Sequence, residues 1–148
     1  ITMKRQLRSI TLLFLSYLGL GWDSKAQNFV PNHSFEDYAI CPDAICQIHR
    51  AIEWSSWGYT PDYYNSCSPI NQYSVPYNNL GYQQAVTGNA YARFATFSTQ
   101  FPNFREYIGA KLLTPLIVGN KYKVSFKVSL PDNSNYASNK TGILNLCS

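Results

Sequence analysis

Aromatic side chains are the residues of this chain with the most specific chemistry. The 148-residue sequence contains twelve tyrosines and three tryptophans but few charges. Flat rings with a polar edge suit stacking on sugar rings, and a few fixed polar groups beside them complete a carbohydrate site. Trp57, beside Gly58, is the candidate for an exposed platform, whereas Trp54 is expected to be buried beside the first strand. The candidate ligand-binding residues are Trp57, Tyr59, Tyr63, Tyr64, Tyr82 and Arg105.

Burial in a strand core is the competing explanation for each of these rings. The two explanations predict different arrangements of Trp57, Tyr59 and Tyr64. If these three residues lie together on an exposed concave face, glycan binding is favoured. If they are buried or scattered, a structural role is favoured.

The histidines, serines and acidic residues of the sequence do not form a recognisable catalytic pattern. The mature chain has two histidines, His33 and His49, and no serine lies in a Gly-x-Ser-x-Gly nucleophile elbow. Glu53, Asp62 and Glu106 could in principle supply paired carboxylates as in glycosidases, but nothing in their spacing brings two of them together. We therefore expect no catalytic activity.

Four cysteines bear on the compartment and the stability of the domain. Cys41 and Cys67 flank a loop-rich segment, and a disulfide between them would contribute roughly 3 kcal/mol by loop closure. Cys46 is the competing partner, and Cys147 lies near the C-terminal end. A zinc site is the alternative, since Cys41 and Cys46 have a C-x4-C spacing with His49 nearby.

The N-terminal region has the pattern of an export signal. Lys4, Arg5 and Arg8 precede an apolar run over 10–20, and Ser24-Lys25-Ala26 places small residues where a signal peptidase reads. The run is too short to span a bilayer comfortably. The sequence therefore predicts a signal peptide over 1–26 and one domain over 27–148. This domain is expected in the periplasm, at the outer-membrane surface or outside the cell.

The charge of the mature domain excludes two classes of partner. Residues 27–148 carry eight basic and seven acidic side chains, so most of the precursor's net charge of +4 belongs to the leader. Nucleic-acid binding needs a clustered basic face, and binding to anionic lipid needs a polybasic segment. We expect neither partner, and no transmembrane segment after signal removal.

Strand patterns position these residues. The clearest strand is 121–130, in which Tyr122, Val124, Phe126 and Val128 alternate with polar residues. A strand with one solvent-exposed face is typical of antiparallel sheets. The sequence predicts an all-β fold, with further strands over 30–38, 89–97 and 105–113 and a long surface loop over 63–84.

Two motifs mark the start of the predicted domain: Asn28-Phe29-Val30-Pro31-Asn32-His33-Ser34-Phe35-Glu36 and Ile52-Glu53-Trp54. Together they resemble the opening of galactose-binding-like jelly rolls, a fold shared by xylanase-associated carbohydrate-binding modules. The chain also resembles a group of exported Bacteroidetes envelope proteins, some of which are fused to an OmpA-like domain or to secretion and gliding-associated tails. That likeness lies in Thr60-Pro61-Asp62-Tyr63-Tyr64-Asn65-Ser66-Cys67 and in segments 81–83, 87–92, 105–108 and 128–137.

The resemblance runs from about residue 28 to about residue 142 and implies an antiparallel β-sandwich of jelly-roll type. It implies a non-catalytic module that recognises glycan or another cell-envelope polymer. The alternative that it implies is a structural or adhesion domain with protein partners. In related domains an opening acid helps to hold a structural calcium ion; Glu36 matches that acid, and Asp37, which follows it, is the second candidate ligand. Residues 143–148 do not resemble the expected continuation, which predicts a sandwich that is incomplete at its C-terminus.

Overall fold

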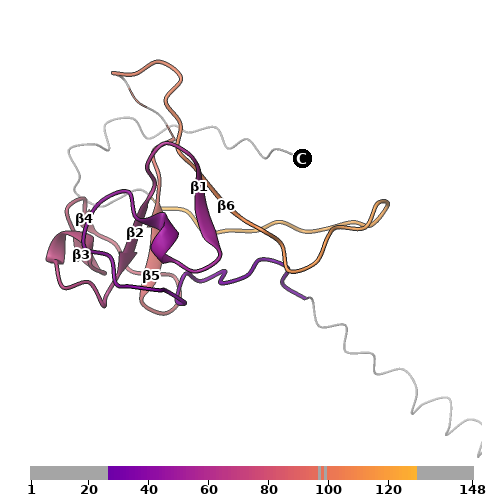
Figure 1. Cartoon of the computed structure of the whole chain (residues 1–148), viewed down its shortest axis with the longest axis horizontal. Helices are drawn as coiled ribbons and strands as arrows, with labels where there is room; N and C mark the ends of the chain where they lie inside the picture. Colours follow the sequence, from indigo (N-terminus) through magenta and orange to yellow (C-terminus); the bar gives the residue numbers. More distant parts are fainter. Residues whose placement is uncertain (1–26, 97, 99, 130–148) are drawn as a thin grey trace, which may run out of the picture.

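Small antiparallel sheets make up the regular structure. The computed structural model describes residues 27–96, 98 and 100–129, so the predicted signal peptide, the tail 143–148 and Cys147 lie outside it. Within these residues the strands form three two-stranded sheets (Figure 1), which confirms the all-β class but does not show a sandwich or a jelly roll. The pairs are β1 (Trp54–Gly58) with β6 (Tyr107–Ala110), β2 (Asp62–Asn65) with β5 (Ala90–Arg93), and β3 (Tyr77–Asn78) with β4 (Gly81–Tyr82).

Two short 3-10 helices complete the elements of the described chain. η1 (Ile48–Arg50) precedes β1, and η2 (Asn71–Tyr73) lies between β2 and β3. Among the described residues, no helix is both long and apolar enough to cross a membrane.

The centre of the fold is β2, whose four residues are all buried. Tyr63 packs with Ala51 and Ala90 in the core, and Phe35 and Trp54 close this cluster. In the β2–β5 register Tyr63 lies opposite Ala92, and such a small residue leaves room for a large ring in the same layer. The sequence-based interpretation of 63–84 as a surface loop is therefore wrong at its start, because β5 and the opening segment cover β2.

Asn32 organises the opening segment. Its side-chain amide donates to the carbonyl oxygens of Asp37 (2.7 Å) and Ile52 (2.8 Å), and its Oδ1 accepts from the Asp37 N–H. The Trp54 indole donates to the Asn32 carbonyl oxygen over 2.9 Å. The backbone φ of Asn32 is 41°, a conformation that asparagine tolerates better than most residues. Segment 30–38 is therefore a series of turns rather than the predicted strand, apart from a single bridge between Tyr38 and Ala51.

Near this segment one further sequence prediction is confirmed and one is confirmed in part. Trp54 is half-buried against the core, with its ring 4.6 Å from that of Phe35 between centroids. Cys41 and Cys67 form a disulfide, which joins the loop before η1 to the end of β2. Cys46 is a free thiol, so it is not the partner of either residue.

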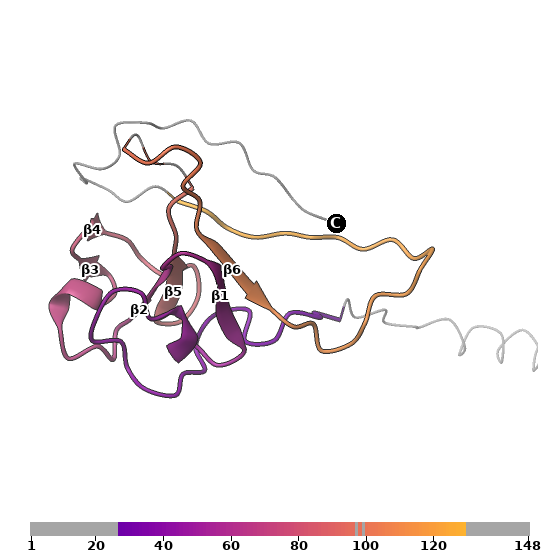
Figure 2. The same ribbon diagram turned by 45° about the horizontal axis from the view of Figure 1, so that its top comes forward.

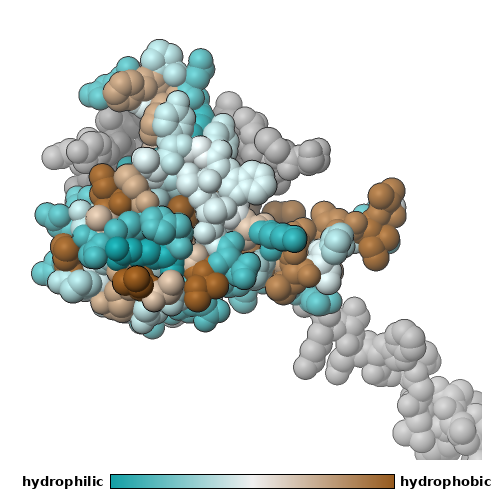
Figure 3. Space-filling model, in the orientation of Figure 1, coloured by the Kyte–Doolittle hydropathy of each residue, from teal (hydrophilic) through white to brown (hydrophobic). Residues whose placement is uncertain are grey.

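The segment predicted most clearly as a strand is not one in the structure. Residues 121–129 form no strand, and Val124, Phe126 and Val128 are exposed. After β6 the chain runs out as an arm and returns past the sheets without joining them (Figure 2). Among the exposed apolar residues of this arm are Leu113, Leu116, Ile117 and Val118. Figure 3 shows an apolar projection, coloured brown, at the right, where the arm lies in Figure 1. An alternating pattern expresses only a preference, and a strand also needs a hydrogen-bonded neighbour.

Candidate functional site

An exposed tryptophan rests on the β1–β6 pair. Trp57 lies at an irregularity of the ladder between Ser56 and Gly58, a position where bulges re-aim side chains. Its side chain is 73% exposed, which confirms the prediction of an exposed ring. The indole covers Gly109 so closely that a Cβ there would lie 2.6 Å from Nε1. Trp57 therefore has one side supported by backbone.

Hydrogen bonds orient this ring. The Trp57 Nε1–H donates to Ser55 Oγ over 3.0 Å, and the Ser55 hydroxyl contacts the Gly109 carbonyl oxygen at 3.3 Å. Glycine at position 109 is what permits the close approach, since any larger residue would lift the indole away. The outcome is a ring whose position is set by its own sheet.

A second ring lies next to Trp57 on the sheet. Tyr107 is opposite Gly58 in the register and is 54% exposed. A Cβ on Gly58 would lie 3.0 Å from Tyr107 Cδ2, so this ring too packs over a glycine. Tyr107 and Gly109 are two residues apart in β6, so they lie on the same face of the sheet. We define the β1–β6 aromatic face as Trp57 and Tyr107 together with the glycines beneath them.

A third exposed ring, that of Tyr59, follows Gly58. Tyr59 is 60% exposed and stacks on Phe104, with the ring centroids 4.3 Å apart. Arg105, a predicted ligand-binding residue, is half-buried, and its guanidinium contacts the Phe104 carbonyl oxygen at 2.6 Å. Tyr59 therefore follows the end of β1, and Arg105 lies two residues before the start of β6, so both lie close in sequence to the aromatic face. Tyr107 is not among the site residues predicted from the sequence, although it lies two residues before Gly109 in the predicted strand 105–113.

The other predicted stacking residues do not join this group. Tyr63 and Tyr64 are 0% and 1% exposed, so their assignment as ligand-stacking rings is wrong, because all four residues of β2 are buried inside the fold. Tyr82 is half-buried and packs edge-on against Tyr77 at 4.9 Å. Its sheet, β3–β4, lies on the opposite side of the body from β1 in both ribbon views (Figures 1 and 2). The trio of Trp57, Tyr59 and Tyr64 is thus split, with two rings exposed and one buried.

Glu36 has a different role from the expected calcium ligand. Its Oε1 accepts the backbone N–H groups of Asn89 (2.8 Å) and Ala90 (3.0 Å). An oxygen that faces two N–H donors is poorly placed to coordinate a cation, which needs six to eight oxygen ligands. Asp37 is exposed and contributes its backbone groups to Asn32. Among the described residues, no further histidine, cysteine or acidic side chain joins Glu36 and Asp37 in a metal-binding group, so these two residues do not fit a calcium site built on several carboxylates.

The zinc alternative also fails among the described residues. Cys41 is oxidised in its disulfide with Cys67, and an oxidised cysteine has no thiolate for a metal. No group of three histidine, cysteine or acidic side chains is close enough there to hold a metal ion.

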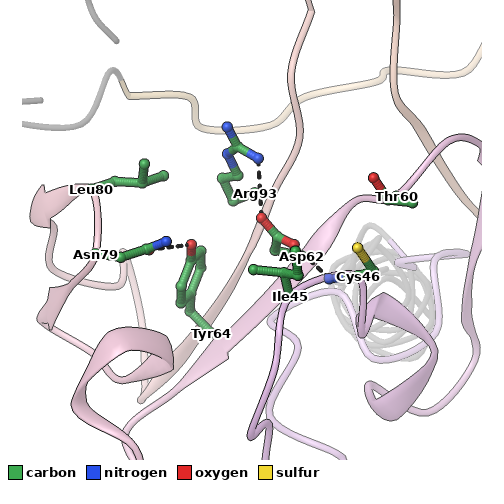
Figure 4. A pocket seen from close by; sticks show the side chains of 8 residues that line it. All are labelled: Ile45, Cys46, Thr60, Asp62, Tyr64, Asn79, Leu80 and Arg93. Atoms are coloured by element: carbon green, nitrogen blue, oxygen red, sulfur yellow. Dashed lines mark hydrogen bonds and ion pairs between the residues drawn. The ribbon is translucent and has the colours of Figure 1, made fainter. Parts of the chain in front are cut away.

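The structure places Asp62 and Glu106 on either side of Arg93, although their spacing in the sequence gave no reason to expect the two acids close together. The guanidinium NH1 of Arg93 is 3.0 Å from Asp62 Oδ2 and 4.0 Å from Glu106 Oε2. Asp62 also accepts the Cys46 backbone N–H (Figure 4), and Glu106 accepts the Thr60 hydroxyl. Burial raises the pKa of Asp62, while the Cys46 N–H and Arg93 oppose that rise. The β2–β5 register, which sets Asp62 opposite Arg93, creates this cluster.

Comparisons with known proteins returned no match: no protein-family model, no curated protein and no solved structure is similar to this chain. The likeness to galactose-binding-like domains therefore stays a prediction from the sequence motifs.

Proposed function

We propose that this protein is an exported, non-catalytic recognition module that binds glycan at the bacterial cell envelope through the β1–β6 aromatic face. Export is supported by the leader pattern over 1–26 and by the Cys41–Cys67 disulfide, a bond typical of oxidising compartments. The near-balanced charge of residues 27–148 suits an uncharged polymer as ligand.

The observation that carries the proposal is the supported indole of Trp57. Sugar rings present C–H groups on their faces, and a flat aromatic surface binds these groups by stacking. A ring whose rotamer is already set by Ser55 and Gly109 loses little conformational entropy when a ligand binds. Tyr107, on the same face of the sheet, extends the platform along the strand direction.

A structural or adhesion domain without glycan binding is the second candidate. Two observations favour it: the burial of Tyr64 divides the predicted trio of rings, and an apolar arm is exposed over 113–118. Exposed apolar segments of this kind commonly mark protein contacts. The resemblance to envelope proteins fused to OmpA-like domains agrees with this candidate as well.

Retention on insoluble polysaccharides separates the two candidates. We expect the mature secreted chain to be retained on at least one of cellulose, chitin, xylan and peptidoglycan sacculi. The variant Trp57→Ala should lower its affinity at least about tenfold, which corresponds to about 1.4 kcal/mol. Tyr77→Ala is the matched control, because Tyr77 is 68% exposed on the separate β3–β4 sheet. Equal losses in both variants, or no retention of the unmodified chain, would favour the structural candidate.

A further inference from the structure

A small cleft lies on a different part of the fold from the aromatic face. It has a volume of about 240 Å³ and lies where β2, β5, the Cys46 turn and the β3–β4 turn meet. Figure 4 shows Leu80 and Asn79 on one side, Thr60 and Cys46 on the other, and Arg93 and Asp62 between them. Polar groups and apolar side chains therefore alternate around one opening.

We infer that this cleft binds a single neutral sugar residue or a polyol of similar size. The inference concerns a second site and does not depend on the role proposed for Trp57. It follows from the hydrogen-bonding groups that remain available, from the balance of charge, and from the size and rigidity of the cleft.

Arg93 supplies unused donors. Its guanidinium has five N–H groups, and its contacts with Asp62 and Glu106 both involve NH1. Within the part of the chain that the structure describes, Nε and NH2 have no protein partner. The Arg93 side chain is 35% exposed, so these donors are accessible from the cleft. A ligand with hydroxyl or ring oxygens can accept from them.

The charges around Arg93 favour a neutral ligand. Two carboxylates, Asp62 and Glu106, lie beside the one guanidinium. Their combined charge would repel a phosphate or a carboxylate that approached Arg93. A hydroxyl group meets no such repulsion, because it can donate to Asp62 and accept from Arg93 at the same time.

The remaining walls suit the other features of a sugar. The Tyr64 hydroxyl donates to Asn79 Oδ1 over 2.8 Å. This hydrogen bond fixes the orientation of the Asn79 amide and uses its oxygen, so that its Nδ2 remains as a donor. Leu80 and Ile45 add apolar surface that can cover the C–H groups of a pyranose ring. Tyr64 thus acts as a buried support for the cleft rather than as an exposed stacking surface.

The size and the rigidity of the cleft restrict the ligand further. Its volume is below the roughly 300–1,000 Å³ of pockets for drug-sized molecules, so one ring is the appropriate scale. The Asp62 carboxylate is held by the Cys46 N–H at 2.7 Å and by Arg93 at 3.0 Å. A cleft whose polar groups are already oriented loses less free energy when it binds a ligand.

Titration of the mature chain, observed by ¹⁵N NMR at the arginine Nε–H groups, tests the inference. We expect galactose, glucose or mannose to shift the Arg93 signal in a saturable way, and acetate to leave it unchanged. Arg50, which pairs with Asp43, serves as the internal control whose signal should not move. Arg93→Lys keeps the positive charge but loses the fork of donors, so its affinity, followed by backbone amide shifts at Asn79 and Leu80, should fall at least about tenfold.

Additional variants keep the outcome interpretable. Leu80→Ala removes apolar cover from the rim without changing the Asp62–Arg93 pair, and it should weaken sugar binding even if Arg93→Lys fails to fold. Trp57→Ala should leave the titration unchanged, so failure of the cleft and failure of the aromatic face are distinguishable. The absence of a saturable Arg93 shift with all three sugars, or a shift with acetate, would overturn the inference.

Discussion

The carboxylate of Glu36 occupies the space beside Gly88 in which any side chain would have to lie. A Cβ on Gly88 would be 2.4 Å from the Glu36 carboxyl carbon, and the backbone φ of Gly88 is +66°. The same carboxylate accepts the N–H groups of Asn89 and Ala90, where β5 begins. The opening segment is thereby joined to a strand more than fifty residues later in the chain.

Gly88→Ala should therefore destabilise the domain more than its left-handed backbone alone explains. We expect a loss of about 2–4 kcal/mol, from the strained φ and from displacement of a hydrogen-bonded carboxylate. Gly119→Ala is the matched control, because Gly119 has φ +88° but nothing within 4 Å of its added Cβ. Urea unfolding of both variants measures the difference, and equal losses would contradict the role of Glu36.

The Trp54 indole should contribute through its hydrogen bond as well as its packing. Trp54→Phe removes the donor to the Asn32 carbonyl oxygen, and we expect a loss of at least about 1 kcal/mol in the free energy of unfolding. Trp57→Phe is the control, because its N–H bonds to the exposed Ser55 and can be replaced by water. A Trp57→Phe loss as large as that of Trp54→Phe would contradict the assignment of Trp54 to the core.

Gly109→Ala should move the Trp57 ring without unfolding the domain. The added Cβ would collide with the indole, but an exposed side chain can rotate away, so we expect a stability change within about 0.5 kcal/mol. The near-UV circular dichroism of the tryptophans should change, and retention on polysaccharide should weaken if the ring position matters. An unchanged spectrum would show that Gly109 does not set the position of the indole.

The disulfide should stabilise the domain and leave one nearby thiol reactive. Replacing Cys41 and Cys67 together by serine should cost about 3 kcal/mol, since their sequence separation is 26 residues. Peptide mapping without reductant should find Cys41 linked to Cys67 and alkylation at Cys46. Cys46→Ser should have little effect on stability, and a Cys46-linked peptide would contradict the observed pairing.

Alkaline pH should destabilise the domain through its buried tyrosines. Burial raises the pKa of Tyr63 and of Tyr91 to about 12, from an ordinary value of 10.0. The folded state then holds these protons more tightly than the unfolded state, so stability falls as pH rises from about 10 to about 12. Tyrosinate absorbance should show a late-titrating class that vanishes in denaturant. A single class near 10 in the folded chain would contradict this prediction.

Several features could be read from the sequence because they depend on local chemistry. A tryptophan beside Gly58 in a turn-rich stretch was expected to be exposed, and Trp54 was expected to be buried. The Cys41–Cys67 bridge was favoured because these two cysteines flank a loop-rich segment, although Cys46 competed as a partner. The all-β class followed from strand propensities and from weak helical periodicity. In each case the neighbours that matter are close in sequence, or the residue type limits the outcomes.

Other features depend on which distant segments lie together. Tyr63 and Tyr64 resemble the exposed tyrosines in type, but both are buried. Distant segments contact them: the opening segment reaches Tyr63 through Phe35, whereas Asn79 and Tyr91 contact Tyr64. Residues 121–129 have an ideal alternation but no strand neighbour among the described residues. Composition and periodicity thus predicted the secondary-structure class, whereas tertiary structure decided burial, strand pairing, the choice of Cys67 rather than Cys46 as the partner of Cys41, and the contacts of Asp62, Arg93 and Glu106. The physical reason is that solvent exclusion and hydrogen-bond partners are properties of the assembled chain.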